Sequence, residues 1–364
     1  MTEKMMEQNE KVLEKMKQSF EEFNKFNEQA FKGVETFMKL DASGTNSTER
    51  ELVFQMDKMK LYHYAKRTRT QNKVPTLVVY ALVNTPAMMD IQEDKSFVKN
   101  LLEGGMDLYL IEWGYPSPED KYLTMEDYIL GYIDAAVEFM KKDKEVDKVN
   151  LMGICQGGTF SVIYSALRPE KVKNLITLVT PVDFSAEDGL LFKWAPYLNM
   201  DLIVDAYGNV PGDFMNAGFL TLAPLSLMVN KYLNLVDDFG DDVAMANFMR
   251  MEKWIFDSPD QAGETIRQFI NDLYHDNKLI KGELVIGNEK VDMKNINMPM
   301  LSLYATKDTQ VPVGAAKDIQ KYVSSLDKET HAINTGHIGL FVSGRSAREV
   351  APLITEWSKE RSKK

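Results

Sequence analysis

The sequence predicts an α/β fold, with a mostly parallel sheet, helices on both of its faces and a large helical insertion. Apolar, strand-like runs alternate with helical patterns between residues 76 and 179, and this alternation resumes at residue 299. A single cysteine, Cys155, stands where one buried strand gives way to a helix. Between the two alternating parts lies a long segment, residues 184–297, in which helical patterns dominate.

Residues 1–47 differ from the rest of the chain. Leu13, Met16 and Phe20 recur at steps of three and four residues, which indicates an amphipathic helix or a pair of helices. A polar linker, residues 41–47, follows. Most such helices pack on their own domain. The alternative is a docking surface for a partner or for a hydrophobic particle.

Strand and helix signals alternate from residue 52 onward. The runs on either side of Asp57 and Lys58 predict a β-hairpin. A fully apolar run follows, which is typical of a strand buried on both faces. Thr124 and Asp127 form a capping-box pattern at the start of a helix. The predicted elements are strands 52–56, 59–64, 76–83 and 106–113 and helices 96–102 and 124–140.

The best-defined turn joins a strand, residues 149–154, to a helix through Cys155. This is the layout of a nucleophile elbow, with cysteine in place of serine. Side chains two positions either side of the nucleophile would collide in so tight a turn, so Gly153 and Gly157 have a steric role. The following helix directs its N-terminal amides at the sulfur and favours a thiolate. A lone cysteine can also be a small buried hydrophobe, but the flanking strand and helix favour the nucleophile.

A strand at 172–179 ends the first alternating part. An insertion of this length between two sheet strands predicts a lid or cap over a site, with structural elaboration as the alternative. The predicted domains are an N-terminal segment 1–47, a core of 48–183 and 298–364, and a lid of 184–297. The remaining predicted elements are helices 242–256 and 263–274, strand 299–305, helix 314–326, strand 330–333 and a final helix ending at 361.

Three residues form the candidate catalytic set, in the chain order Cys155, Asp308 and His337. Asp308 follows a predicted strand and His337 lies in a loop after the last one, so both would meet Cys155 at the carboxyl edge of the sheet. Nucleophile, acid and base is the chain order of the α/β-hydrolase fold. The plainer interpretations are a turn aspartate and a solvated histidine. The other histidines lie at poorer positions: His63 in the hairpin, His275 in the insertion and His331 inside a strand.

Acyl chemistry at Cys155 also needs backbone donors for an oxyanion. We expect one from the amide of Gln156 and the other from the loop after strand 76–83, at Val83. A thiolate that attacks a thioester forms another thioester, so the acyl-enzyme can persist. If a lid excludes water, an alcohol becomes the acceptor and transfer replaces hydrolysis. The sequence therefore predicts acyl transfer, with esterase activity as the second option.

The composition excludes several classes of function. A formal net charge of −11 argues against broad nucleic-acid binding. With one cysteine no internal disulfide can form, which fits a reducing cytoplasm. No apolar run approaches the roughly 20 residues of a membrane span, and the charged N-terminus lacks a signal-peptide core. We expect no bound metal.

Several motifs together resemble one family. Gly153-Ile154-Cys155-Gln156-Gly157-Gly158 is similar to the lipase-like box of polyhydroxyalkanoate (PHA) synthases, and in particular of the short class III catalytic subunit. The resemblance covers roughly residue 50 to the end of the chain. Further matching runs are Val79–Asn84, Tyr109–Pro116, Thr180–Phe184, Met251–Asp260 and Gly336–Gly339.

The resemblance implies that Cys155 accepts a 3-hydroxyacyl group from coenzyme A, while His337 deprotonates the thiol and helps to activate the hydroxyl of the growing chain. Asp308 would either orient His337 or act on that hydroxyl. The resemblance also implies 3-hydroxyacyl-CoA as substrate without a further cofactor, an obligate noncatalytic E subunit, a dimer or higher hetero-oligomer, and residence on polyester granules in the cytoplasm. Thr309 stands where the family has histidine, so no role of that histidine carries over.

Two alternatives remain open on the sequence. One is an esterase of the dienelactone-hydrolase type, which also uses an elbow cysteine but is much shorter and lacks so long a cap. The other is an inactive granule-associated scaffold on the same fold, because a fold does not fix a function. The complete set of Cys155, Asp308 and His337 argues against the scaffold.

Overall fold

The computed structural model describes residues 47–222, 231, 235 and 241–362. The sheet belongs to one compact unit, Thr45–Leu222 with Trp254–Lys364. The second unit comprises Met1–Gly44 and Ala223–Lys253, of which only residues 231, 235 and 241–253 are described. The predicted N-terminal amphipathic helix therefore lies outside the described residues.

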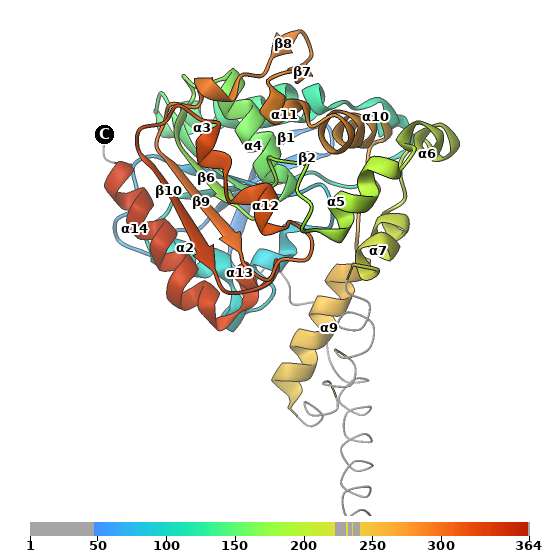
Figure 1. Cartoon of the computed structure of the whole chain (residues 1–364). Helices are drawn as coiled ribbons and strands as arrows, with labels where there is room; N and C mark the ends of the chain where they lie inside the picture. The colour runs from blue at the N-terminus through green and yellow to red at the C-terminus, as the bar shows by residue number, and fades with distance from the viewer. Residues whose placement is uncertain (1–46, 223–230, 232–234, 236–240, 363–364) are drawn as a thin grey trace, which may run out of the picture. The chain divides into compact units, whose positions relative to one another are not determined.

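An eight-stranded sheet forms the centre of the first unit, in the order β1-β2-β4-β3-β5-β6-β9-β10 (Figure 1). The pairs β1–β2 and β2–β4 are antiparallel, and all other neighbours in the sheet are parallel. The predicted hairpin and the mostly parallel sheet are thus confirmed. The strands are β1 (Arg50–Met56), β2 (Met59–Tyr64), β3 (Thr76–Val79), β4 (Leu108–Glu112), β5 (Val149–Ile154), β6 (Val172–Leu178), β9 (Met300–Ala305) and β10 (Lys328–Ile333).

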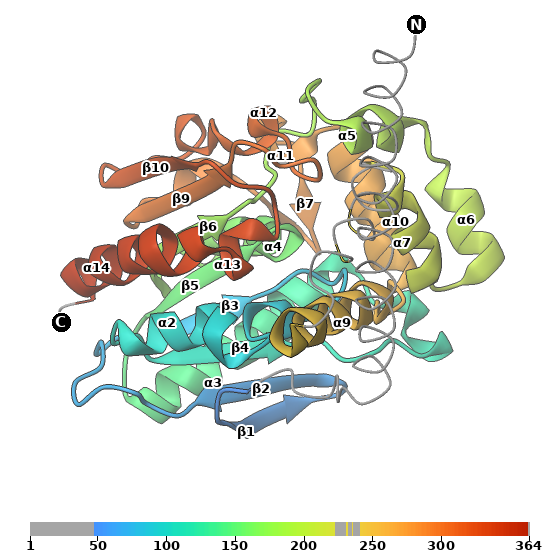
Figure 2. The same ribbon diagram turned by 90° about the horizontal axis from the view of Figure 1, so that it is seen from below.

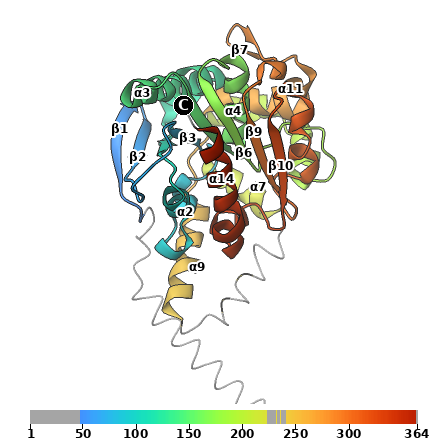
Figure 3. The same cartoon turned by 90° about the vertical axis from the view of Figure 1, so that its left-hand side faces the viewer.

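Helices cover both faces of this sheet, because alternate residues of each central strand point to opposite sides. In β3, Leu77 and Val79 join one buried apolar cluster and Val78 joins the other. Helices α3 (Asp134–Lys144) and α4 (Gln156–Leu167) pack on the first face. Helices α2 (Phe97–Glu103), α13 (Gly339–Val342) and α14 (Ala351–Arg361) pack on the second (Figures 2 and 3).

The helix starts follow the capping signals in the sequence. The Ser96 side chain accepts a hydrogen bond from the Lys99 amide at the start of α2, and Gly104 is the C-cap of this helix. At the next helix the Thr124 amide donates to Asp127 Oδ2 at 2.8 Å, as the capping box predicts. That helix begins with a π-helical segment, Asp127–Ile133, and continues as α3.

The predicted strand 76–83 is too long, because β3 ends at Val79. Beyond that point the backbone groups bond to side chains instead of to neighbouring strands. The Leu82 amide donates to Gln156 Oε1 at 3.0 Å, and the Leu82 carbonyl accepts from Gln261 Nε2 at 3.0 Å. The run stays apolar to Leu82 because this loop is buried, so hydrophobicity alone could not mark the end of the strand.

The predicted helix 314–326 is wrong. The structure has a short helix α12 (Val313–Ala316) and a separate 3₁₀ turn, Ile319–Lys321. The ammonium of Lys328 binds the carbonyl of Gln320 at 2.7 Å, and the Ser324 amide donates to Ile296. These tertiary partners take backbone groups that a continuous helix would pair internally.

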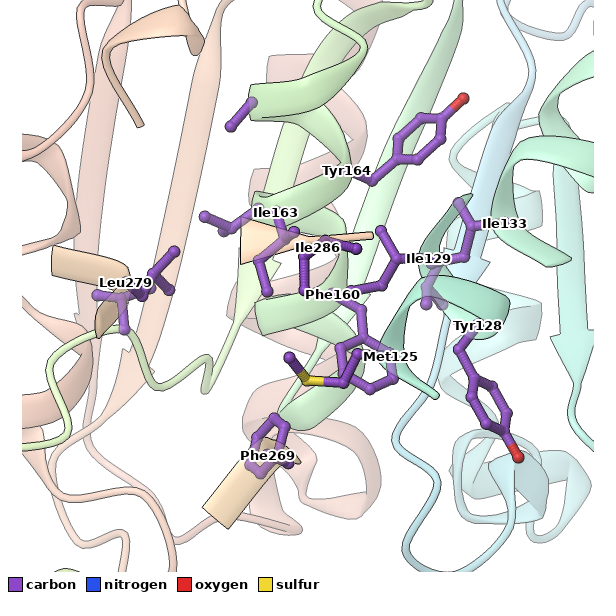
Figure 4. Close-up of a cluster of buried hydrophobic side chains, with 14 of the residues drawn as sticks. Met125, Tyr128, Ile129, Ile133, Phe160, Ile163, Tyr164, Phe269, Leu279 and Ile286 are labelled. Carbon is purple, nitrogen blue, oxygen red and sulfur yellow. The ribbon is translucent and has the colours of Figure 1, made fainter. Parts of the chain in front are cut away.

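The insertion between β6 and β9 is mainly helical and also contains a small hairpin that the sequence did not predict. In its described part Phe269, Leu279 and Ile286 pack beside α4 (Figure 4). The ring centroids of Phe269 and Phe160, a residue of α4, lie 6.0 Å apart. Its elements are α5 (Leu190–Trp194), η5 (Ala195–Tyr197), α6 (Met200–Tyr207), α7 (Gly212–Leu220), α9 (Asp242–Phe256), α10 (Gly263–Gln268), η8 (Phe269–His275), α11 (Lys278–Lys281), β7 (Val285–Ile286), β8 (Glu289–Lys290) and η9 (Met293–Asn295).

We predict that Gly157→Ala destabilises the fold by about 2–4 kcal/mol. A Cβ atom at this position would lie 2.3 Å from the Val79 oxygen and 2.4 Å from the Tyr80 oxygen, and neither backbone group can move freely. Urea unfolding measures the loss. Gly131→Ala is the matched control, since its Cβ would meet no atom within 4 Å and should stabilise the helix by up to about 1 kcal/mol. Equal stability of the two variants would contradict the steric explanation.

Candidate active site

Cys155 lies in the turn between β5 and α4, with its backbone at φ 54° and ψ −124°. Residues other than glycine rarely adopt this conformation, which persists only where the surroundings hold it. The Cys155 amide donates to the Leu178 carbonyl at 2.9 Å, and its carbonyl accepts from the Gly158 amide at 2.9 Å. The half-buried thiol is thus presented on a backbone fixed from both sides.

The glycines around Cys155 permit this turn, as the sequence predicts. A Cβ atom on Gly153 would lie 2.5 Å from the Gly158 Cα atom, and one on Gly158 would lie 1.8 Å from Thr180 Oγ1. The collisions differ from those expected, because the flanking residues would strike α4 and the neighbouring loops rather than each other. The glycines therefore let the helix approach two strand ends.

Asp308 and His337 form a hydrogen-bonded pair beyond the ends of β9 and β10. The Asp308 side chain is fully buried and that of His337 is 13% exposed. His337 Nδ1 lies 2.7 Å from Asp308 Oδ2, and Cys155 lies close enough to the imidazole to raise its pKa. The structure thus brings the three predicted residues together in one continuous row.

The environment of His337 favours the charged imidazolium. Burial opposes the charge, but the charges of Asp308 and Cys155 and the hydrogen bond to Asp308 outweigh it and raise the pKa of His337 well above its ordinary value. This arrangement can supply a nucleophilic sulfur together with a proton for a leaving group.

The carboxylate of Asp308 is fully engaged. Its Oδ1 accepts the amides of Gln310 at 2.8 Å and Val311 at 2.9 Å, while Oδ2 faces His337. Of the two roles left open for Asp308, this geometry favours orienting the imidazole, because neither oxygen is directed at open space.

The two predicted oxyanion donors are unpaired backbone amides. The Leu82 amide is taken by Gln156 Oε1, whereas the amides of Val83 and Gln156 donate to no acceptor within the described residues. Gln156 is the first residue of α4, where helix amides lack partners inside the helix. Both amides are therefore free to donate a hydrogen bond to a ligand oxygen.

Sequence reasoning missed the side chains that hold the loop after β3. Trp254 Nε1 donates to the Thr85 carbonyl at 2.7 Å, and Ser258 Oγ lies 2.8 Å from Asn84 Oδ1. With Gln261, these residues of the insertion fix the segment that contains Val83. The run Met251–Asp260, which contains Trp254, is recognisable as a motif, but its spacing does not reveal the loop that it contacts.

The other histidines are engaged elsewhere. His63 pairs with Asp107 at 2.7 Å, and His331 lies 3.2 Å from Glu329. Within the described ranges, no group of three or more histidine, cysteine, aspartate or glutamate side chains is arranged to hold a metal ion. No helix among those residues combines the length and apolar character needed to cross a bilayer.

Comparison with known proteins agrees with this geometry. A family model described as alpha/beta hydrolase fold matches residues 85–343. Among solved structures, a putative lipase from Sulfolobus solfataricus superposes with a TM-score of 0.56 at 15% identity, covering 86% of this chain and 99% of that one. A monoacylglycerol lipase from Paleococcus ferrophilus gives a TM-score of 0.52 at 15% identity, covering 80% and 96%. At this identity the likeness shows the fold alone.

Curated relatives are much more similar. The poly(3-hydroxyalkanoate) polymerase subunit PhaC of Allochromatium vinosum is 49% identical over 331 residues, which cover 90% of this chain and 93% of that one. The protein of the same name from Synechocystis sp. is 46% identical over 345 residues, covering 92% and 91%. Similarity of this extent, on the fold and motifs described above, makes the chain a member of the poly(3-hydroxyalkanoate) polymerase PhaC family.

Proposed function

We propose that this chain is the catalytic subunit of a class III poly(3-hydroxyalkanoate) polymerase. It transfers 3-hydroxyacyl groups from coenzyme A to a growing polyester through a thioester on Cys155. The observation that carries the proposal is the Asp308–His337 hydrogen bond beside Cys155, in a chain 49% identical to a polymerase subunit.

In the first step the Cys155 thiolate attacks the carbonyl carbon of the 3-hydroxyacyl thioester. The amides of Gln156 and Val83 donate to the oxygen of the tetrahedral intermediate. The bond from the acyl carbon to the coenzyme A sulfur then breaks, and His337 gives its proton to that sulfur. The acyl group is left on Cys155 as a new thioester.

In the second step the hydroxyl at the end of the polyester attacks the thioester on Cys155. His337 accepts the hydroxyl proton, an ester bond forms, and the sulfur leaves as the thiolate. Asp308 keeps His337 Nδ1 occupied, so that the other ring nitrogen serves both steps.

We assign residues 184–297 the role of a lid that keeps water from the acyl-enzyme, so that an alcohol is the acceptor. Support comes from the bonds of Trp254 and Gln261 to the loop after β3, where the insertion meets a proposed oxyanion donor. Residues 1–47 are proposed as a separate N-terminal segment.

The partners follow from the same assignment. We propose a complex with a noncatalytic E subunit, as a dimer or higher hetero-oligomer, on polyester granules in the cytoplasm. The substrate is 3-hydroxyacyl-CoA, and no metal or other cofactor takes part. The support for these statements is membership of the PhaC family.

Incubation with 3-hydroxybutyryl-CoA, with and without an E subunit, tests the function. We expect release of coenzyme A together with insoluble polymer. Release with free 3-hydroxybutyrate would favour an esterase of the dienelactone-hydrolase type, and no release would favour an inactive scaffold.

Cys155→Ser should lower polymer formation by at least about a hundredfold, since an alkoxide is harder to form than a thiolate and an oxygen ester is a poorer acyl donor. The rate of coenzyme A release measures this effect, and the thermal unfolding midpoint serves as the folding control. Turnover near that of the unsubstituted protein would contradict a thioester intermediate.

Asp308→Asn should slow acylation of Cys155 by about 10²–10⁴-fold. An amide NH₂ group facing His337 Nδ1 favours the tautomer that directs a proton, and not a lone pair, toward the sulfur. Single-turnover release of coenzyme A reports this step, and Asp318→Asn, at a partly exposed aspartate paired with Lys321, is the control. Normal acylation with slow chain elongation would instead mean that Asp308 acts on the hydroxyl.

The raised pKa of His337 also makes stability depend on pH. The folded state binds the imidazole proton more tightly than the unfolded chain, whose histidine pKa is about 6.5. The stabilisation is therefore complete below pH 6.5 and is lost as the pH rises through the folded-state pKa. We expect His337→Gln to reduce the free energy of unfolding more at pH 6 than at pH 9 in urea titrations. The control is His331→Gln, at a partly exposed strand position. A loss of unfolding free energy in His337→Gln that grows as the pH rises would refute the charged pair.

A further inference from the structure

Two tyrosines outside the catalytic row lie near enough to Cys155 for its charge to raise their pKa. Tyr80 is 7% exposed and Tyr274 is 9% exposed, and neither hydroxyl hydrogen-bonds any residue that the structure describes. Burial, followed by the negative charge of Cys155, raises the pKa of both phenols. The phenols are thus neutral donors within electrostatic reach of the nucleophile, without protein partners in the described part of the chain.

The two tyrosines lie on different sides of Cys155, which packs against both apolar clusters of the sheet. Tyr80 belongs to the cluster containing Ala305, Ile333 and Phe341, on the segments that flank Asp308 and His337. That side is already used for proton transfer. Tyr274 belongs to the other cluster, which contains residues of the insertion and against which Cys155 also packs.

The aromatic ring of Tyr274 is held firmly. Its centroid lies 4.8 Å from that of Phe184, 5.1 Å from Phe192 and 6.1 Å from Phe269. Just beyond the η8 helix, the Asn277 side chain accepts a hydrogen bond from the Phe184 amide at 3.1 Å. Such packing fixes the position of the hydroxyl before a substrate binds.

We propose that the Tyr274 hydroxyl binds the 3-hydroxyl group of the acyl unit as that unit is transferred to Cys155, and thereby selects 3-hydroxyacyl over unsubstituted acyl thioesters. This inference rests on the proposed polymerase function. The aromatic walls alone would accept either acyl group. A largely buried phenol with no protein partner among the described residues disfavours a substrate that lacks the hydroxyl, because the phenol then gains no hydrogen bond from the substrate.

The test is Tyr274→Phe, which removes one oxygen and retains the ring. The enzyme, in complex with its E subunit and in excess, is mixed with either 3-hydroxybutyryl-CoA or butyryl-CoA, and free coenzyme A is measured after rapid quenching. Because the chain has one cysteine, the mass of the acylated protein identifies the site. We expect acylation by the hydroxylated substrate to slow about tenfold and acylation by butyryl-CoA to change less than about twofold, a tenfold loss of selectivity.

Tyr128→Phe is the matched control. This tyrosine is also buried and belongs to the same network of aromatic rings, but its hydroxyl points away from Phe160 (Figure 4). It should leave both rates unchanged. Equal slowing of both substrates by Tyr274→Phe would assign Tyr274 a purely structural role and overturn the inference, as would unchanged rates with both. If neither substrate acylates the unsubstituted enzyme, the polymerase function itself fails, and this inference with it.

Discussion

Helix α4 touches the end of β3 at Gly157, and the rest of the site depends on this contact. No side chain fits between the helix and the carbonyl oxygens of Val79 and Tyr80. The close approach fixes where α4 begins and requires the positive φ of Cys155 in the turn before it. It also brings the loop after β3 against the first turn of α4. The amides of Val83 and Gln156, which have no acceptor among the described residues, therefore come from two segments that touch at Gly157. The strained turn is tolerated because packing on both sides leaves it no alternative.

The register of the parallel strands then brings the other two residues to the same edge of the sheet. Ile154 of β5 pairs with Leu178 of β6, and Leu178 pairs with Leu303 of β9, so these strands end nearly level. β10 ends level with β9, where Ile333 pairs with Ala305. Residues that follow these strand ends therefore meet, although more than a hundred residues separate Cys155 from Asp308 in the chain.

The elbow, the hairpin and the meeting of Cys155, Asp308 and His337 at one sheet edge could be predicted because each has a local signal: glycines around a cysteine, alternating polarity around a turn, polar residues after apolar strands. The end of β3 could not, since a buried loop and a buried strand are equally apolar. The helix predicted around Asp318 failed because tertiary contacts took its backbone groups. The side chains that hold the loop after β3, such as Gln156 and Trp254, act across long separations that no spacing rule encodes.

The bonds between the insertion and this loop have a mechanical consequence. Trp254 and Gln261 hold the same few residues that contain the Val83 amide. An outward swing of that part of the insertion would break both bonds and release the loop. If residues 184–297 act as the proposed lid, opening it would thus displace the Val83 amide, one of the two proposed oxyanion donors, and closing it would restore that donor. Substrate entry and reaction would then alternate. Water that entered together with the substrate would meet a site that lacks one of its two oxyanion donors.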